Sequence, residues 1–365
     1  MKARVFTAAL LLGALAGSAR TESSRAAEAY VWHLPRGVPH PKVPADNPMS
    51  EAKVRLGRRL FYDTRLSGNG TFACASCHQQ TRAFTDGLAR AKGSTGQQHA
   101  RSAMSLANVA FNASYGWADA RTRTLEAQMA VPMFNEHPVE MGMKGNEATI
   151  VARISSDPAD AALFRDAFPG KAIALDTIVK AIASFERTIV SANSPLDRYL
   201  YRDDRSALTP QAQRGMALFF SDRLACARCH TGFNLSGPTV QEGSAEIAPT
   251  FHNTGLYNVD GRGAYPAIDR GLFDATRVPA DMGRFRAPTL RNIALTAPYM
   301  HDGSIPTLDE VVGHYASGGL KSPVKSPRLK GFEISTTEVE DLVAFLNSLT
   351  DEEFLTKLEL GKPER

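Results

Sequence analysis

Apolar residues recur at helical spacing in several separate stretches of the chain. The stretches 48–63 and 209–222 each begin with a proline near the helix start, contain a glycine in the middle, and end on an aromatic pair and then aspartate. These features are typical of a helix with one buried face. Glycine inside a helix costs about 1 kcal/mol relative to alanine. Its presence at the same place in both stretches therefore predicts that another helix packs closely against each one.

Two further stretches predict amphipathic helices. One is 175–189, and the other is 337–349, which opens with Thr337 and Glu340 in the spacing of a capping box. The charged stretch 197–206 lacks apolar periodicity and predicts a linker. The Gly- and Pro-rich region 232–287 predicts loops over the site that the Cys-x-x-Cys-His motif at 226–230 forms. Because no long strand pattern occurs, the sequence predicts a mainly α fold.

The composition is that of an ordinary soluble protein. The chain has 365 residues, of which 43% are hydrophobic and 22% are charged, and this excludes a disordered or fibrous protein. The length suggests two domains. There are 42 basic and 38 acidic residues, and no Lys/Arg block stands out, so a nucleic-acid partner is not indicated.

The first 19 residues have the pattern of a secretory signal peptide. Lys2 and Arg4 form a basic start, an apolar run follows at 5–15, and Gly-Ser-Ala at 17–19 offers a cleavage site. An uncleaved membrane anchor is the alternative, but the apolar run is too short to span a bilayer comfortably. The sequence therefore predicts export to the periplasm with no membrane anchor. Loss of Lys2 and Arg4 would lower the net charge from +4 to +2.

All four cysteines lie in two copies of one motif, Cys-x-x-Cys-His, at 74–78 and 226–230. In an exported protein, four cysteines would ordinarily suggest disulfides, and a four-cysteine zinc site is a second alternative. A histidine directly after both pairs instead matches c-type haem attachment, in which two thiols add to the haem vinyl groups and the histidine lies under the iron. The sequence therefore predicts two covalent haems c and no disulfide. The attachment residues would be Cys74, Cys77 and His78 for the first haem, and Cys226, Cys229 and His230 for the second.

Each motif follows one of the two glycine-containing helices, as in a cytochrome c. The stretch 337–349 resembles the C-terminal helix of a cytochrome c, which packs across the N-terminal one. The predicted fold is mainly α, with two tandem cytochrome c-like domains that each carry one covalent c-type haem. After a signal peptide at 1–19, we expect an N-terminal domain over 20–205 and a C-terminal domain over 206–365.

The sixth ligand of each iron decides the chemistry, because electron transfer uses a filled position and catalysis uses an open one. For the second haem, Met300 is one candidate ligand. The following helix offers another, since Thr307 and Glu310 have capping-box spacing and the apolar residues 308, 311 and 312 place Tyr315 on the buried face. A buried phenol needs a partner for its oxygen. From the helix alone, that partner is either a backbone carbonyl or the haem iron.

Several blocks in the same order resemble the bacterial di-haem cytochrome c peroxidase/MauG superfamily over nearly the whole mature length. They are both haem motifs, Leu-Ser-Gly-Asn-Gly at 66–70, Phe-Thr-Asp-Gly at 84–87, Leu-Glu-Ala-Gln at 125–128, His-Pro-Val-Glu-Met-Gly at 137–142, and 288–303. At the position of Tyr315 the peroxidases carry a methionine ligand, whereas the MauG-type enzymes carry tyrosine. The resemblance therefore implies Tyr315, rather than Met300, as the ligand. The segments 117–119 and 134–140 look most like the MbnH kind of MauG-type enzyme, found in methanobactin gene clusters, which acts on a companion copper-binding protein.

The resemblance also implies which residues surround the first haem. Gln128 and Glu140 would line its distal side, with Glu140 as the proton shuttle for O–O cleavage. Glu136, one helical turn earlier if that stretch is helical, is a weaker rival. His99 lies in the segment that supplies a distal histidine in the peroxidases but not at the matching position, so we expect a surface loop residue there.

Other family positions map to the region between the haems. Trp117 corresponds to a tryptophan that relays electrons between the haems, and His301 would organise the second haem pocket. The family also binds a calcium ion through an asparagine side chain and two backbone carbonyls, and the corresponding residues are Ser102, Thr296 and Pro298. The resemblance thus implies calcium, although a serine hydroxyl is a weaker ligand than an amide oxygen.

Three residues stay unassigned. Trp32 lies near the mature N-terminus and does not match the surface tryptophan that MauG uses toward its substrate. His137 and His252 fit either a hydrogen-bonding role or a surface position.

The implied ligands suggest the activity. A phenolate ligand stabilises Fe(III) and Fe(IV) over Fe(II), so the two haems could share the two oxidising equivalents of hydrogen peroxide in a bis-Fe(IV) state. The leading expectation is a peroxide-dependent oxidase of a Trp or Tyr in a partner protein, which by resemblance is a copper-binding periplasmic protein. The alternative is a cytochrome c peroxidase that reduces hydrogen peroxide to water with electrons from a small redox protein. A plain di-haem electron carrier is a third, non-enzymatic class.

Overall fold

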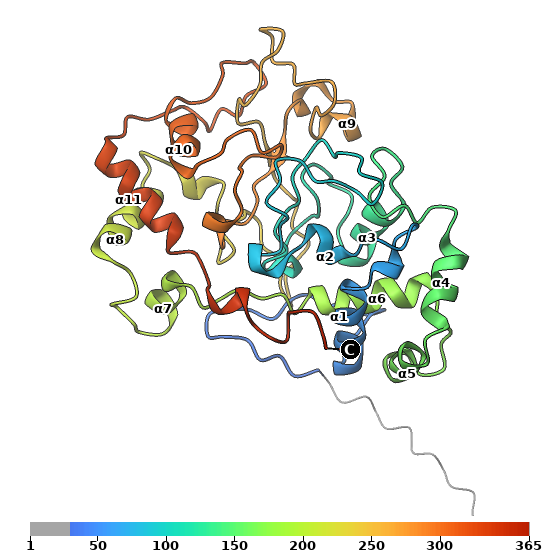
Figure 1. Cartoon of the computed structure of the whole chain (residues 1–365). Coiled ribbons are helices and arrows are strands. Elements are labelled where there is room, and N and C mark those ends of the chain that lie inside the picture. The colour runs from blue at the N-terminus through green and yellow to red at the C-terminus, as the bar shows by residue number, and fades with distance from the viewer. Residues whose placement is uncertain (1–29, 365) are drawn as a thin grey trace, which may run out of the picture.

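The computed structural model describes residues 30–364, so the predicted signal peptide lies outside the described residues. Helices and loops form nearly all of this part of the chain (Figure 1). The helices are α1 (Glu51–Phe61), α2 (Cys74–Cys77), α3 (Leu125–Phe134), α4 (Glu147–Ser155), α5 (Pro158–Ala167), α6 (Leu175–Glu186), α7 (Pro195–Tyr201), α8 (Pro210–Phe219), α9 (Phe273–Thr276), α10 (Leu308–Ala316) and α11 (Thr336–Asn347). Two short antiparallel strands, β1 (Phe251–His252) and β2 (Phe285–Arg286), pair with each other. The mainly α expectation is confirmed.

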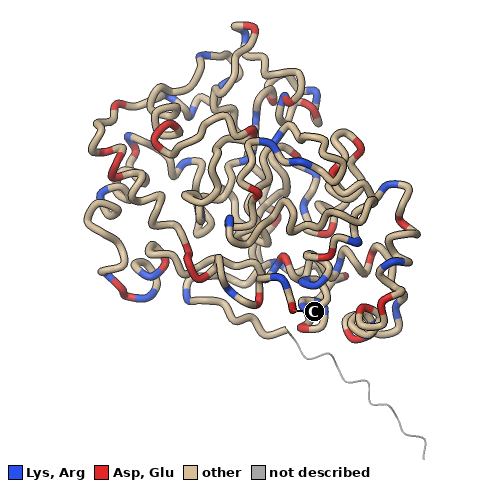
Figure 2. The backbone as a smooth tube through the Cα atoms, in the orientation of Figure 1, with Lys and Arg blue, Asp and Glu red and all other residues tan. Residues whose placement is uncertain are grey.

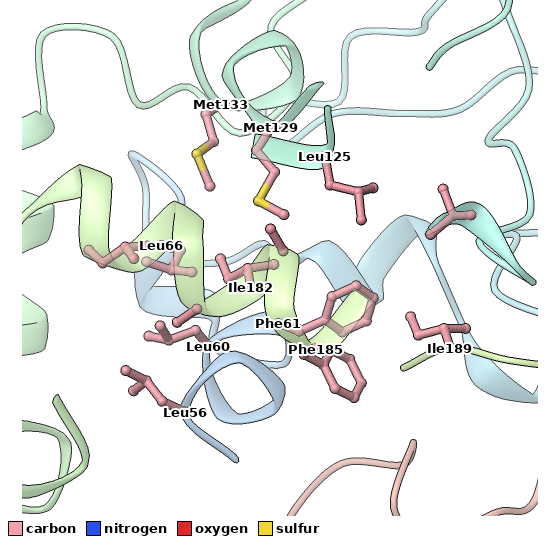
Figure 3. Close-up of a cluster of buried hydrophobic side chains, with 14 of the residues drawn as sticks. Leu56, Leu60, Phe61, Leu66, Leu125, Met129, Met133, Ile182, Phe185 and Ile189 are labelled. Atoms are coloured by element: carbon pink, nitrogen blue, oxygen red, sulfur yellow. The ribbon is translucent and has the colours of Figure 1, made fainter. Parts of the chain in front are cut away.

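Helices α1 and α6 cross at close range and form the centre of the first core. A side chain at Gly57 would place its Cβ 1.9 Å from the backbone oxygen of Ala181, so the crossing requires glycine. Beside this point the rings of Phe61 and Phe185 meet edge to face, with centroids 5.2 Å apart. Figure 3 shows that side chains of α3 close the same cluster on the other side of α6. The close helix contact predicted from the mid-helix glycine is confirmed here.

Helices α8 and α11 repeat this crossing in the second core. A Cβ at Gly215 would fall 1.9 Å from the backbone oxygen of Asp341 in α11. The start of α11 differs from the prediction, because Ser335 and Glu338, not Thr337 and Glu340, form the capping box. The cap therefore lies two residues earlier than predicted, because side-chain periodicity alone does not define this boundary.

The stretch 197–206 is only partly a linker, so the expectation for it is wrong in its first half. Helix α7 covers 195–201, with Ser194 as its capping residue and Pro195 at its first position. Asp197 is buried and lies 2.8 Å from Nη1 of Arg291, which compensates both charges. A Ser-Pro start followed by aspartate is itself a helix signal, and it outweighs the lack of apolar periodicity.

The buried apolar residues form two main cores. The first includes helices α1, α3 and α6 and extends to Ile189, whereas the second starts at Leu196 and includes α8, α10 and α11. The C-terminal segment returns to the first core, where the ring of Phe354 lies 5.4 Å from that of Phe84. Figure 1 shows this segment ending beside α1. The domain boundary predicted at 205/206 stays a prediction.

The surface of the described residues carries both signs of charge without large segregation. Figure 2 shows basic and acidic positions interspersed along the chain. None of the helices between residues 30 and 364 is long and apolar enough to cross a membrane.

Candidate di-haem site

The second Cys-x-x-Cys-His motif opens into a cavity of about 350 Å³. The chain turns here through a short 3-10 helix, Cys226–Arg228, which directs both thiols and the following histidine to the same cavity. The wall opposite the motif comes from distant segments, and these include α10, the loop before it, and β2. Residues of this wall include Trp117, His252, Phe285, Arg286, Met300, His301 and Tyr315.

Both motif histidines are held in the same way. Nδ1 of His230 lies 2.8 Å from the backbone oxygen of Leu235, and Nδ1 of His78 lies 2.9 Å from that of Phe84. A hydrogen bond from Nδ1 to a carbonyl fixes the ring and leaves Nε2 free as a metal ligand. Burial lowers the pKa of both histidines, which keeps the imidazoles in the neutral form that binds iron. The two rings are therefore prepared for the same role.

The four cysteines are all free thiols and belong to separate sites. Cys74 packs against the first core and Cys226 against the second. Burial raises the pKa of Cys77 to about 12 and that of Cys226 to about 11. Within the described residues no group of three or more His, Cys, Asp or Glu side chains could hold a metal ion. A shared four-cysteine zinc site does not fit this arrangement.

Tyr315 and Met300 both reach the wall of the His230 cavity, so the structure brings together both candidate ligands. Tyr315 lies on α10, which begins at its capping residue Thr307 as the sequence indicates. Its neighbour His314 points away and lies 3.1 Å from the backbone oxygen of Thr254. Among the described residues no group forms a hydrogen bond with the Tyr315 hydroxyl, and burial raises the pKa of this phenol. The side chain of Tyr315 is half-buried, and a phenol without a protein partner is suited to binding a group placed in the cavity.

Glu140 lies beside the first motif, and its charge contributes to the raised pKa of Cys77. Burial raises the pKa of Glu140 itself, while a hydrogen bond from Asn135 opposes the shift. Glu136 is different, because it lies outside any helix, is exposed and pairs with Lys144. Of these two glutamates, Glu140 is therefore the one that is partly protected from solvent.

His99 does not lie on the open surface, so that expectation is wrong. Its Nε2 lies 3.8 Å from Oε1 of Glu140, and burial lowers its pKa. The loop 91–101 folds back on itself, with the amide of His99 bonded to the oxygen of Ala91, and this brings the ring inward. Gln128 lies on α3 beside Gly116. A Cβ atom added at Gly116 would lie 3.8 Å from the amide oxygen of Gln128.

Trp117 is placed between segments that lead to the two motifs. Its indole lines the His230 cavity, and Nε1 donates to the backbone oxygen of Ser102 at 3.0 Å. Burial lowers the pKa of His78, and the backbone of Met104, two residues after Ser102, opposes this by raising it. The segment 102–104 thus runs from Trp117 to the first motif. This placement supports the predicted relay position, which stays a prediction.

His301 forms part of the cavity wall and is held rigidly. Its ring stacks on Phe285 with centroids 3.7 Å apart, and its Nε2 lies 3.8 Å from Oδ2 of Asp269. Burial lowers the pKa of His301 to about 4, so the ring is neutral. Asp269 is bound at two points by Arg101, at 2.6 and 2.8 Å. These contacts support the predicted organising role of His301.

One of the three predicted calcium ligands, Ser102, is bonded to the segment that follows the other two. The amide of Ser102 donates to the oxygen of His301 at 2.8 Å, which brings Ser102 next to the 296–301 segment. Within the described residues, neither the backbone oxygens of Thr296 and Pro298 nor the Ser102 hydroxyl takes part in a hydrogen bond. Free oxygens of this kind suit calcium, and the ion itself stays a prediction.

Some residues of the site gave no signal in the sequence. His252 lies in β1 and lines the His230 cavity, and burial lowers its pKa to about 4. Arg286 in β2 is buried and donates from Nε to the oxygen of Gly116 at 3.2 Å. Both belong to the Gly- and Pro-rich region, where no periodicity indicates which side chains turn inward. His137 is exposed, and Trp32 contacts Tyr30 and His40 away from the motifs.

The helix crossings and the two histidine motifs define a c-type cytochrome with two haem sites. Comparison with known proteins gives its family: the chain belongs to the di-haem cytochrome c peroxidase/MauG family, whose cofactors are haems. Residues 51–205 match the model described as di-haem cytochrome c peroxidase, and residues 284–315 match one described as RoxA-like, cytochrome c-like. The methylamine utilization protein MauG of Methylorubrum extorquens is 37% identical over 322 residues, which cover 88% of this chain and 84% of that protein.

Two further comparisons give the same result. The cytochrome c peroxidase Ccp of Escherichia coli is 35% identical over 314 residues, covering 86% of this chain and 61% of that protein. The crystal structure of a MauG-like protein associated with microbial copper homeostasis superposes with a TM-score of 0.89. That protein is 46% identical, and the match covers 92% of this chain and 100% of the other. The protein is thus an oxidoreductase with a MauG-type fold.

Proposed function

We propose that this protein is a peroxide-dependent di-haem oxidase that removes electrons from a tryptophan or tyrosine side chain of a partner protein. The observation that carries the proposal is the free hydroxyl of Tyr315 in the wall of the His230 cavity. Tyr315 and His230 would bind the iron of the second haem. A phenolate ligand favours the higher oxidation states of iron, so this site would store an oxidising equivalent rather than pass electrons inward.

The first site would be the one that meets hydrogen peroxide. Its haem, held by Cys74, Cys77 and His78, would supply the redox chemistry of O–O cleavage. Glu140 would hold the proton that this step needs, because burial favours its protonated form. Gln128 would offer an amide on the same side, and Trp117 would carry electrons between the sites.

The proposed partner is a copper-binding periplasmic protein. The similar structure at 46% identity is described as associated with copper homeostasis, which supports a partner from this area. We further propose that the mature chain is exported, and that Ser102, Thr296 and Pro298 bind a calcium ion that links the loops between the two sites.

A cytochrome c peroxidase is the second candidate. Met300 lies in the same cavity wall as Tyr315, and a thioether ligand would give a readily reduced haem that feeds electrons to the first site. This enzyme would reduce hydrogen peroxide to water with electrons from a small redox protein.

The ligand variants distinguish the two functions. Tyr315→His should keep both haems, seen by their absorbance, but lose the coupled two-haem near-infrared band after peroxide addition and lose partner oxidation. Met300→Leu, in the same wall, should retain both. The opposite pattern would assign Met300 as ligand and support the peroxidase.

A further inference from the structure

We propose that oxidising equivalents leave the second site through Tyr265 and Tyr257, and that Tyr257 is the residue that takes the electron from the partner's aromatic side chain. The proposal rests on the oxidase function above and names the route by which the oxidising equivalents reach the surface. It follows from an aromatic cluster, defined here as Trp117, Tyr257, Tyr265, Phe285 and His301.

The cluster is continuous from the cavity wall outward. Phe285 and His301 line the His230 cavity. The ring of Tyr265 lies 6.1 Å from that of Phe285 and 6.5 Å from that of His301. Tyr257 then lies 5.5 Å from Tyr265, edge to face, and its ring also lies 6.5 Å from that of His301. These are ordinary aromatic contact distances, so an electron can move inward through rings that touch, without crossing a wide saturated gap.

Trp117 joins the same cluster from the side of the first site. It packs against a small separate core that includes Tyr265 and Phe285. The tryptophan proposed to relay between the haems and the tyrosines proposed to lead outward therefore share one set of contacts. Either haem site has access to Tyr265 through this core.

The hydrogen bond of Tyr257 favours its oxidation. Its hydroxyl donates to Oδ2 of Asp302 at 2.5 Å. A phenol that loses one electron becomes a strong acid, so oxidation needs a proton acceptor already in place. The other carboxylate oxygen, Oδ1, accepts from the amide of Ser304 at 3.1 Å. The carboxylate is therefore held in place beside the phenol as its proton acceptor.

Tyr265 lacks such an acceptor. Its hydroxyl donates to the amide oxygen of Asn253 at 3.0 Å and accepts from the amide of Leu256 at 3.2 Å. An amide oxygen takes up a proton far less readily than a carboxylate. The radical should therefore settle on Tyr257, with Tyr265 as a contact on the way.

Tyr257 also lies where a partner can reach it. It is partly exposed in the region 232–287, and the loops of this region extend to the upper edge of the molecule in Figure 1. Val259, two residues on, is 62% exposed and gives the rim an apolar contact. The rival aromatic pair, Tyr30 and Trp32, touches His40 but has no ring contact with the cluster within the described residues.

The step balances as follows in electrons and protons. Tyr257 gives one electron inward through Tyr265 and its phenolic proton to Asp302, which leaves a neutral phenoxyl radical. The partner's aromatic side chain then gives one electron to this radical, and Asp302 returns the proton. Two such cycles supply the two electrons that, together with two protons, reduce one hydrogen peroxide to two waters.

The test uses the holoprotein and hydrogen peroxide without any partner. In a protein labelled with ring-deuterated tyrosine, we expect a tyrosyl radical in the EPR spectrum that Tyr257→Phe removes. The decay of the oxidised two-haem spectrum should slow about tenfold or more in this variant, while its rate of formation stays unchanged. Tyr199→Phe is the matched control, since Tyr199 is also partly exposed but contacts Arg205 outside the cluster.

Asp302→Asn is the second variant and keeps the ring in place. It should lower the radical yield at Tyr257 while haem absorbance and peroxide reactivity persist. If Tyr257→Phe behaves like Tyr199→Phe, or if Trp32→Phe removes the radical instead, the exit is wrong. If the unaltered holoprotein never shows the oxidised two-haem spectrum, the proposed oxidase function itself is refuted, whatever the result for Tyr257.

Discussion

Glu140 is the acid of the first site whose surroundings suit proton transfer. It is half-buried near Cys77, with His99 3.8 Å away, whereas Glu136 is exposed and bound to Lys144. We expect Glu140→Gln to slow the reaction with hydrogen peroxide by about a hundredfold or more, which is the usual contribution of a general acid or base. Glu136→Gln should change it little. Stopped-flow absorbance measures both rates, and a larger loss in Glu136→Gln would reverse the assignment.

Glu186 is a buried acid at the end of α6 that the proposed chemistry does not use. It is 8% exposed, and burial raises its pKa from 4.5 to about 8, with Glu126 adding to the shift and Arg187 opposing it. Between pH 4.5 and 8 the unfolded chain loses this proton while the folded chain keeps it. The free energy of unfolding should therefore fall by about 1.4 kcal/mol per pH unit in this window and level off above pH 8.

Glu186→Gln should remove that dependence. We expect its stability relative to the unaltered protein to rise by a few kcal/mol from pH 5 to pH 8, as measured by denaturant unfolding at several pH values. The exposed Glu340→Gln is the control and should show a constant difference. A constant difference in Glu186→Gln as well would mean that Glu186 is already ionised in the folded protein.

At the scale of elements, the two glycine crossings carry the architecture. Gly57→Ala and Gly215→Ala would each push a methyl group to within 1.9 Å of a backbone oxygen. Each should lower the melting temperature and cost at least about 1–3 kcal/mol. Gly313→Ala in α10 is the matched control, because nothing lies within 4 Å of its Cβ position and alanine is the better helix former. Equal melting temperatures for all three variants would contradict the crossing.

The sequence predicts a helix well when the residues that indicate it are neighbours in the chain. The α1 and α8 glycines and the Thr307 cap of α10 can be read from a few neighbouring residues. The site is harder to predict, because it depends on contacts between distant segments. Nothing in the order of residues near His252 or Phe285 indicates that β1 and β2 pair and bring both side chains to the His230 cavity. The position of His99 is hard to predict for the same reason, since its loop turns back toward Glu140.

At the scale of the whole molecule, one segment connects the two sites. Ser102 binds the backbone of His301 and accepts the indole N–H of Trp117, and Met104 lies near His78. The C-terminal segment adds a second link, because Phe354 from beyond α11 packs in the first core. An oxidation shared between two haems requires their sites to keep a fixed relation, and these links provide it.

Both sites should act together on hydrogen peroxide without prior reduction. The most direct measurement is to add hydrogen peroxide to the as-purified diferric protein and record near-infrared and EPR spectra over time. We predict a long-lived coupled two-haem signal that a copper-binding partner shortens, with oxidation of a partner Trp or Tyr seen by mass spectrometry. Activity that appears only after one-electron reduction would contradict this account and support the peroxidase. Two haems that are both inert to peroxide would indicate an electron carrier.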